Sequence, residues 1–208
     1  MFRTYTFPRW VERFYPEALW RMPLTDRKTL YITFDDGPYP ESTPWLLDSL
    51  EDAGIKSTFF CTGRQMEGQP ALFGQLKAAG HTVGSHTFSH LNGWKSNKDD
   101  YVRDVKRAAE VSGNLLFRPP YGRLRIGQYR NLIEEGYTVV FWTLMTYDFD
   151  ATLHASARRE KIQKHAQDGS IIVFHDSPKA FEQLKNELPD LIHYWKSEGY
   201  SFGLIPTA

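Results

Sequence analysis

The chain has 208 residues, enough for one domain with a substantial core and short for two. Lys plus Arg and Asp plus Glu number 25 each, so the chain lacks the basic excess of a nucleic-acid-binding protein. The single cysteine, Cys61, excludes an internal disulfide and a thiolate zinc cluster. With no run of 18 apolar residues we expect no transmembrane span, and with no secretory leader visible the default expectation is a cytoplasmic chain.

Residues 1–27 are rich in aromatic residues and arginine and are broken by charges and prolines. We expect them to form an arm packed on a domain that covers residues 28–208. A peripheral contact with a membrane interface is the alternative interpretation of this composition.

From residue 28 onward, short apolar runs alternate with longer segments of helical periodicity. This alternation is typical of repeated βα units around a parallel sheet. The expected strands are 28–34, 56–61, 81–85, 115–118, 137–142, 170–174 and 200–204, and the expected helices are 43–53, 70–79, 98–111, 126–135, 155–167 and 180–197. A glycine is favoured directly after the C-terminus of a helix. Five glycines stand between an expected helix and the next expected strand: Gly54, Gly80, Gly136, Gly169 and Gly199. The pattern predicts a compact, TIM-barrel-like (β/α) barrel with fewer than eight units.

Acidic and imidazole side chains follow several of the expected strands, at the face where such barrels carry function. Asp35 and Asp36 end the first strand before a Gly-Pro turn. An ordinary turn is the plain interpretation, but paired carboxylates at a barrel mouth also suit a metal ligand beside a proton acceptor.

The third strand is followed by two histidines, His86 and His90, at a spacing that lets both rings point the same way across one helical turn. Two histidines at this spacing are often solvent-exposed residues without a functional role. Two histidines with one of the carboxylates would hold a divalent metal and leave positions open for water and substrate. The same ligand set occurs in non-haem Fe(II) oxygenases, which is one alternative.

Two further motifs follow the fourth and sixth expected strands. Arg118 opens a stiff Pro-Pro loop in which the Tyr121 backbone N–H is held as a candidate oxyanion donor. His175 leaves an apolar strand and is a candidate general acid, or else hydrogen-bonded scaffolding. The other histidines, His81, His154, His165 and His193, are expected to be solvated and away from this face.

The motifs TFDDGP, SHTFSH, RPPYG and the late strand ending in His175 resemble, in order, those of polysaccharide deacetylases of the NodB-homology type, carbohydrate esterase family 4. The resemblance runs from about Leu30 to Asp176. It implies a distorted (β/α)7 barrel and removal of acetyl groups from a glycan. It also implies a divalent metal, zinc before cobalt or nickel, and the following roles: Asp35 as general base, Asp36, His86 and His90 as metal ligands, Arg118 orienting Asp35, Tyr121 N–H as oxyanion donor and His175 as general acid.

The fourth motif of the family is altered. Met145 stands where the resemblance expects the acid that braces the arginine, and Phe149 stands where it expects a tryptophan. A thioether cannot accept a strong hydrogen bond from a guanidinium. We therefore expect another acid to brace Arg118, with Asp150 favoured over Asp148 and Asp176. The substrate groove is expected to include Pro120, Tyr147, Asp148, Phe149 and Asp150.

The sequence thus predicts a metal-dependent hydrolase that removes N-acetyl groups, or O-acetyl groups, from a carbohydrate and releases acetate. The alternative outside enzymes is a carbohydrate-binding protein on an inactive deacetylase scaffold, motivated by Met145. The expected partner is an acetylated glycan or oligosaccharide. No pattern sets an oligomeric state.

Overall fold

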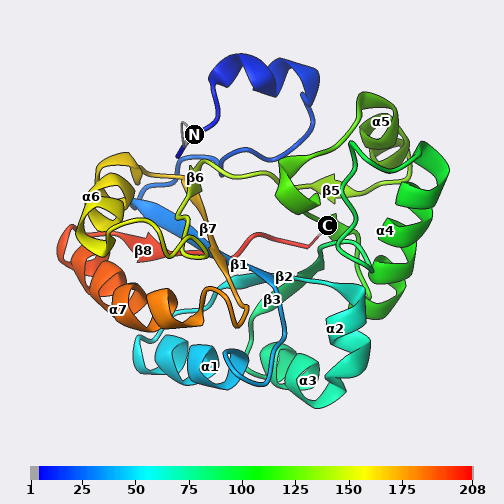
Figure 1. The fold of residues 1–208 in the computed structure, drawn as a ribbon. Coiled ribbons are helices and arrows are strands. Elements are labelled where there is room, and N and C mark those ends of the chain that lie inside the picture. Colours follow the sequence, from blue (N-terminus) through cyan, green and yellow to red (C-terminus); the bar gives the residue numbers. More distant parts are fainter. Residues whose placement is uncertain (1–4, 208) are drawn as a thin grey trace.

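A parallel β-sheet curls into a barrel, and helices pack around it (Figure 1). The computed structural model describes residues 5–207. Within them the strands pair in the order β5-β4-β3-β2-β1-β7-β6, and β8 pairs with the start of β1. The strands are β1 Thr29–Asp36, β2 Thr58–Cys61, β3 Thr82–Ser85, β4 Leu116–Phe117, β5 Thr138–Val139, β6 Leu144–Met145, β7 Ile171–His175 and β8 Ser201–Phe202.

The helical elements lie between and outside these strands (Figure 1). They are η1 Arg9–Phe14, α1 Thr43–Asp52, α2 Gly63–Gly68, α3 Pro70–Ala78, α4 Lys98–Ser112, η2 Pro120–Gly122, α5 Ile126–Glu134, α6 Ala155–His165 and α7 Phe181–Ser197. None of the described helices is both long and apolar enough to cross a bilayer.

Alternation along β1 decides which of its side chains enter the barrel. Leu30, Ile32 and Phe34 belong to the apolar cluster that β1 shares with α1 and α7. The side chains between them point to the opposite face, inside the barrel, where Tyr31 joins a second apolar cluster. The same alternation puts Thr33 and then Asp35 in the barrel interior, near the C-terminal end of β1.

One segment, residues 138–145, supplies the strands at both ends of the sheet order. Its first part, β5, pairs with β4, and its last part, β6, pairs with β7. Between the two, the N-terminal arm is hydrogen bonded to the chain: Leu19 N–H donates to the Val139 carbonyl, and Phe141 N–H donates to the Leu19 carbonyl. Trp20 stacks on Phe141 with ring centroids 4.1 Å apart. The arm therefore packs where β5 and β6 diverge.

The predicted barrel is confirmed, and most elements lie within a few residues of the expected ranges. The expected strand at 137–142 is wrong in detail, because only Thr138–Val139 forms a strand there and a further short strand follows at Leu144–Met145. The helical elements η1, α2 and η2 were not predicted. The glycines expected at helix-to-strand turns all adopt positive φ, namely Gly54, Gly80, Gly136, Gly169 and Gly199.

Candidate active site

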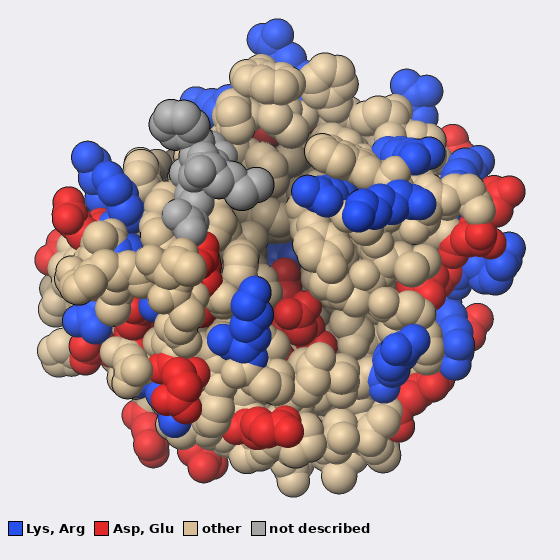
Figure 2. All heavy atoms as spheres, in the orientation of Figure 1, with Lys and Arg blue, Asp and Glu red and all other residues tan. Residues whose placement is uncertain are grey.

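Polar side chains gather where the strands end. The strand β1 ends with Asp35 and Asp36, β7 ends with His175, and the other predicted site residues follow the ends of β3, β4 and β6. Asp35 and His175 are register partners on neighbouring strands. Because parallel strands end at one face of a barrel, these distant parts of the sequence meet. Figure 2 shows a hollow near the middle of this face, with acidic side chains inside it.

Asp35 is buried, with 3% of its surface exposed, and pairs with a fully buried arginine. Its Oδ1 accepts a hydrogen bond from Arg118 Nη1 at 2.7 Å. Its Oδ2 lies 3.9 Å from His86 Nε2 and takes part in no hydrogen bond within residues 5–207. Arg118 therefore occupies one carboxylate oxygen and leaves the other facing the histidines. Breaking such a buried pair from one side typically costs about 3–5 kcal/mol.

Among residues 5–207, Asp35 is the one acid paired with Arg118, and the other partners of the guanidinium are uncharged. Its Nη1 also donates to Thr33 Oγ1 at 2.6 Å, and its Nη2 donates to the Phe141 carbonyl at 3.1 Å. The guanidinium carbon lies 4.1 Å from the centroid of the Phe60 ring, close enough for a cation–π contact. The buried hydroxyl, carbonyl and ring together fix the guanidinium plane.

The expectation that Asp150 braces Arg118 is wrong. Asp150 Oδ1 accepts hydrogen bonds from the Thr152 N–H and hydroxyl, and Arg118 is not among its partners. Met145 lies in β6, where its N–H donates to the Tyr5 carbonyl. The acid missing at Met145 is thus compensated by groups on β1 and on the segment after β5.

Asp36, His86 and His90 converge as the ligands of one ion would. Asp36 Oδ1 lies 3.2 Å from His90 Nε2 and 3.9 Å from His86 Nε2. One ligand atom from each residue lies within 4.8 Å of the others. Asp36 Oδ1 is buried without a hydrogen bond, even though His90 is near. An orphaned buried carboxylate oxygen is rare, and a cation would satisfy it.

Hydrogen bonding and charge prepare these groups as ligands. His86 Nδ1 lies 2.7 Å from the Arg118 carbonyl and donates to it, which leaves the Nε2 lone pair on the side of Asp36. Burial lowers the pKa of His86 to about 4, so its ring is neutral at pH 7. Burial alone would raise the pKa of Asp36, but His90, His175 and His86 hold that pKa below its usual range.

The loops of this face carry unusual backbone conformations. Among the described residues, the non-glycine positions with φ between 57° and 83° are Asp36, Thr87, His90, Tyr121 and Tyr147. Each such position costs of order 1–3 kcal/mol and persists only where its surroundings enforce it, and such positions cluster at functional sites. The expectation that His86 and His90 share a helical turn is therefore wrong. A strained loop, not a helix, brings the two rings to centroids 5.1 Å apart.

His175 faces the site from β7 and is held by Asp148. Its Nδ1 lies 2.8 Å from Asp148 Oδ1, and its backbone N–H donates to Asp148 Oδ2 at 2.7 Å. Burial alone would lower the pKa of His175, but Asp148 outweighs it and raises the pKa to about 9. The imidazole is therefore protonated at neutral pH, as a proton donor must be.

The groove expected around these groups is only partly as predicted. Asp148 is 1% exposed and lies behind His175, so its placement in an open groove is wrong. Pro120 is buried as well. Phe149 packs edge-on against His175 with centroids 4.7 Å apart, and Tyr147 lies against Phe149 at 5.8 Å. These two half-buried rings lie beside His175.

Tyr121 has the features expected of a backbone donor. It follows Pro119 and Pro120, which have no N–H, and within the described chain its own N–H makes no hydrogen bond. Its φ of 61° and its ring contact with His90, at 4.8 Å between centroids, hold it beside the candidate metal ligands.

Sequence reasoning gave little weight to Asp176, which ties β7 to α1. Its carboxylate accepts hydrogen bonds from the Ser42 and Thr43 hydroxyls at 2.5 and 2.6 Å. A Cβ at Gly37 would lie 2.2 Å from Asp176 Oδ2, so the turn after the Asp pair requires glycine. Burial raises the pKa of Asp176 to about 6. Its place directly after His175 was the available signal.

His81 was expected to be solvated. It is instead 7% exposed and accepts a hydrogen bond from Ser57 N–H.

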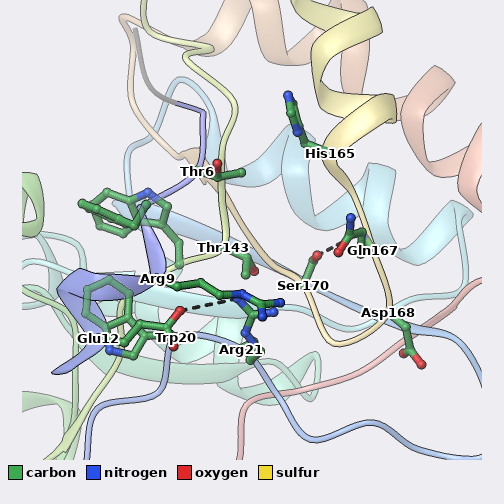
Figure 3. A pocket seen from close by; sticks show the side chains of 12 residues that line it. Thr6, Arg9, Glu12, Trp20, Arg21, Thr143, His165, Gln167, Asp168 and Ser170 are labelled. Atoms are coloured by element: carbon green, nitrogen blue, oxygen red, sulfur yellow. Dashed lines mark hydrogen bonds and ion pairs between the residues drawn. The ribbon is translucent and has the colours of Figure 1, made fainter. Parts of the chain in front are cut away.

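A second pocket lies between the N-terminal arm and the barrel (Figure 3). Arg9, Glu12 and Arg21 come from the arm, and Thr143 and Ser170 lie near the starts of β6 and β7. Arg21 pairs with Glu12 at 3.5 Å. None of the predicted site residues lines this pocket, so the convergent acids and histidines, and not this cavity, mark the candidate active site.

The family comparison agrees with this geometry. Residues 23–140 match the family model described as polysaccharide deacetylase. A peptidoglycan-N-acetylglucosamine deacetylase of Bacillus cereus is 32% identical over 189 residues, which cover 88% of this chain and 88% of that protein. A second Bacillus cereus protein of the same name is 31% identical over 183 residues, which cover 85% of this chain and 66% of that protein.

Solved structures share the fold. One is a peptidoglycan N-acetylglucosamine deacetylase that was crystallised with an N-hydroxybenzamide compound. It matches with a TM-score of 0.87 and 28% identity, and the alignment covers 97% of this chain and 96% of that chain. A family 4 carbohydrate esterase pseudoenzyme from Bacillus anthracis has a TM-score of 0.81 and 20% identity, covering 91% of this chain and 68% of its own. At that identity the likeness concerns the fold alone.

Proposed function

Because this chain belongs to the polysaccharide deacetylase family, we propose that it is a metal-dependent hydrolase that removes N-acetyl groups from a glycan and releases acetate. One observation carries the proposal: Asp36, His86 and His90 converge on one point while the free oxygen of Asp35 faces them. O-acetyl groups are the second substrate class, since the same site would attack an ester.

The donor set suits a divalent transition metal. Two neutral imidazoles and one carboxylate are typical ligands of a hydrolytic zinc ion, and cobalt or nickel accept the same set. Asp36 Oδ1, His86 Nε2 and His90 Nε2 would hold the ion. When bound, the ion supplies polarisation of the acetyl carbonyl and acidification of a water molecule.

The protein's own groups then move the protons. Asp35 Oδ2 accepts the proton of the attacking water, because Oδ1 is committed to Arg118. The Tyr121 N–H donates a hydrogen bond to the developing oxyanion. His175, protonated and oriented by Asp148, gives its proton to the departing amine, so the products are acetate and a free amino sugar.

An inactive carbohydrate-binding scaffold is the second candidate, motivated by Met145. The structure weakens that motive, because Arg118 and Asp35 are paired at 2.7 Å without an acid at position 145. A non-haem iron oxygenase is the third candidate and differs in requiring molecular oxygen.

The test is acetate release from N-acetylated chitooligosaccharides and peptidoglycan fragments under nitrogen, with Asp35→Asn as the matched control. Release by the parent chain and loss in Asp35→Asn support the proposal. Binding of a metal and of glycan without acetate from any of them would favour the inactive scaffold. A requirement for oxygen would favour the oxygenase.

A further inference from the structure

Two large aromatic side chains near the candidate metal site are exposed to solvent, although side chains of this size are usually buried. Trp94, in the loop after β3, is 56% exposed, and Tyr121 is 58% exposed. Tyr121 contacts the metal-ligand candidate His90. Such rings, held in water beside a reaction site, are suited to the apolar face of a sugar.

Arg123 links the two rings. Its guanidinium carbon lies 5.1 Å from the Trp94 centroid and 5.8 Å from the Tyr121 centroid, within cation–π range of both. Arg123 is half-buried, and within residues 5–207 its side chain makes no hydrogen bond or ion pair. Contact with two ring faces leaves the N–H edges of the guanidinium as its free hydrogen-bonding surface. A carboxylate is the group that matches those edges in a bidentate manner.

The loop that carries Trp94 is rigid. The Asn92 side chain accepts from the Trp94 N–H, and Arg125 Nη2 donates to the Trp94 carbonyl. The fully buried Gln128 donates to the Gly93 carbonyl. A Cβ at Gly93 would lie 2.3 Å from the Arg123 carbonyl oxygen, so glycine allows the two loops to touch. The indole is thus exposed on a preorganised support, which lowers the entropic cost of binding.

Charge favours an anionic partner at this place. Figure 2 shows basic side chains beside the hollow, on the side where Figure 1 places α5. Three acids of the site have partners inside it, Asp35 with Arg118, Asp148 with His175 and Asp176 with two hydroxyls, and the fourth, Asp36, faces His86 and His90 in the candidate metal site. No carboxylate of the described chain lies within ion-pair distance of Arg123.

We propose that Trp94, Tyr121 and Arg123 form a subsite for a sugar unit that carries a carboxylate, adjacent to the unit that is deacetylated. The sugar's apolar face lies on the indole, and its carboxylate accepts hydrogen bonds from Arg123. The inference rests on the proposed function for the neighbouring unit only, because the subsite itself requires no turnover.

The experiment measures binding by calorimetry in an Asp35→Asn background, so that the ligand is not consumed. The probes are a tetrasaccharide of alternating N-acetylglucosamine and N-acetylmuramic acid, its carboxylate methyl ester, and N-acetylated chitotetraose. We expect the free-acid form to bind roughly 10- to 100-fold more tightly than the ester, the range of a charged hydrogen bond. Arg123→Gln should abolish this preference, and Arg123→Lys should keep part of it.

Trp94→Ala should weaken binding of the acid and the ester alike, and Arg130→Gln, an exposed arginine on α5, is the matched control and should change nothing. Equal binding of acid and ester, an intact preference in Arg123→Gln, or no binding of any probe would overturn the subsite. Acetate release by the parent chain is measured separately. Its failure would count against the proposed function and leave the result on the subsite standing.

Discussion

Replacing Asp148 by Asn should change the protonation of His175 more than any other property of the site. The amide keeps the shape of the side chain but removes the negative charge that lies 2.8 Å from His175 Nδ1. The rise in the pKa of His175 from 6.5 to about 9 corresponds to about 3 kcal/mol. Without Asp148, burial is opposed only by the weaker effects of Asp36 and Asp35, so the pKa should fall from about 9 to its unperturbed value of 6.5 or below.

Two assays measure this change. In the metal-free chain, NMR titration of the His175 ring should give a pKa of about 9 in the parent and a much lower value in Asp148→Asn. In the loaded chain, the alkaline limb of the kcat/KM profile should lie at or below pH 9, because a cation near His175 repels the imidazolium, and it should move to lower pH in the variant. Since the folded-state pKa is raised, the accompanying stabilisation is complete below pH 6.5 and disappears as the pH rises through about 9. An unchanged titration in Asp148→Asn would refute the reasoning.

Three further predictions follow from the same contacts. His90→Ala should lose the bound metal, measured by elemental analysis, because two remaining ligands hold a divalent ion poorly; stoichiometric metal in the variant would remove His90 from the site. Asp35→Asn should keep the metal and lose about 10²–10⁴-fold in turnover, the range of general acid–base catalysis, and loss of the metal would instead make Asp35 a ligand. Glu187→Ala should lower the free energy of unfolding by about 3–5 kcal/mol, because it leaves the fully buried Arg158, which Glu187 binds at 2.6 and 2.9 Å, without its charge partner. Chemical denaturation checks this value, and a loss below 1 kcal/mol would show that Arg158 is solvated.

The sequence was most informative where side chains able to bind a metal or transfer a proton stand at the end of an expected strand. The carboxylates Asp35 and Asp36, the pair His86 and His90, and His175 each follow an apolar strand, and parallel strands end at a common face. That rule was enough to predict which side chains meet. It holds without knowledge of loop conformation, because each residue is within a few positions of a strand end.

The support of Arg118 was beyond this kind of prediction. One of its partners is the Phe141 carbonyl, and every residue carries a carbonyl, so no residue type marks it. The contact of Thr33 with Arg118 could have been predicted, since alternation puts Thr33 on the same side of β1 as Asp35. The preference for carboxylates as partners of arginine led instead to Asp150, which binds Thr152 in its own loop.

Loop conformation accounts for the other errors. The spacing of His86 and His90 fits a helix, but Thr87 and His90 adopt positive φ. The hydrogen bonds that enforce this shape, such as the Leu91 N–H to Thr87 Oγ1 and the Phe88 and Ser89 N–H groups to Asp104, come partly from α4. Local periodicity does not contain that information, because it depends on a helix that begins eight residues after His90.

Acetate release before and after removal of the metal tests the central claim most directly. The chain is stripped with a chelator, assayed on its best acetylated oligosaccharide, reloaded with one equivalent of zinc and assayed again. The account predicts that release stops on stripping and returns on reloading, with one ion bound per chain and none bound by His90→Ala. Full acetate release from the stripped, metal-free chain would contradict it.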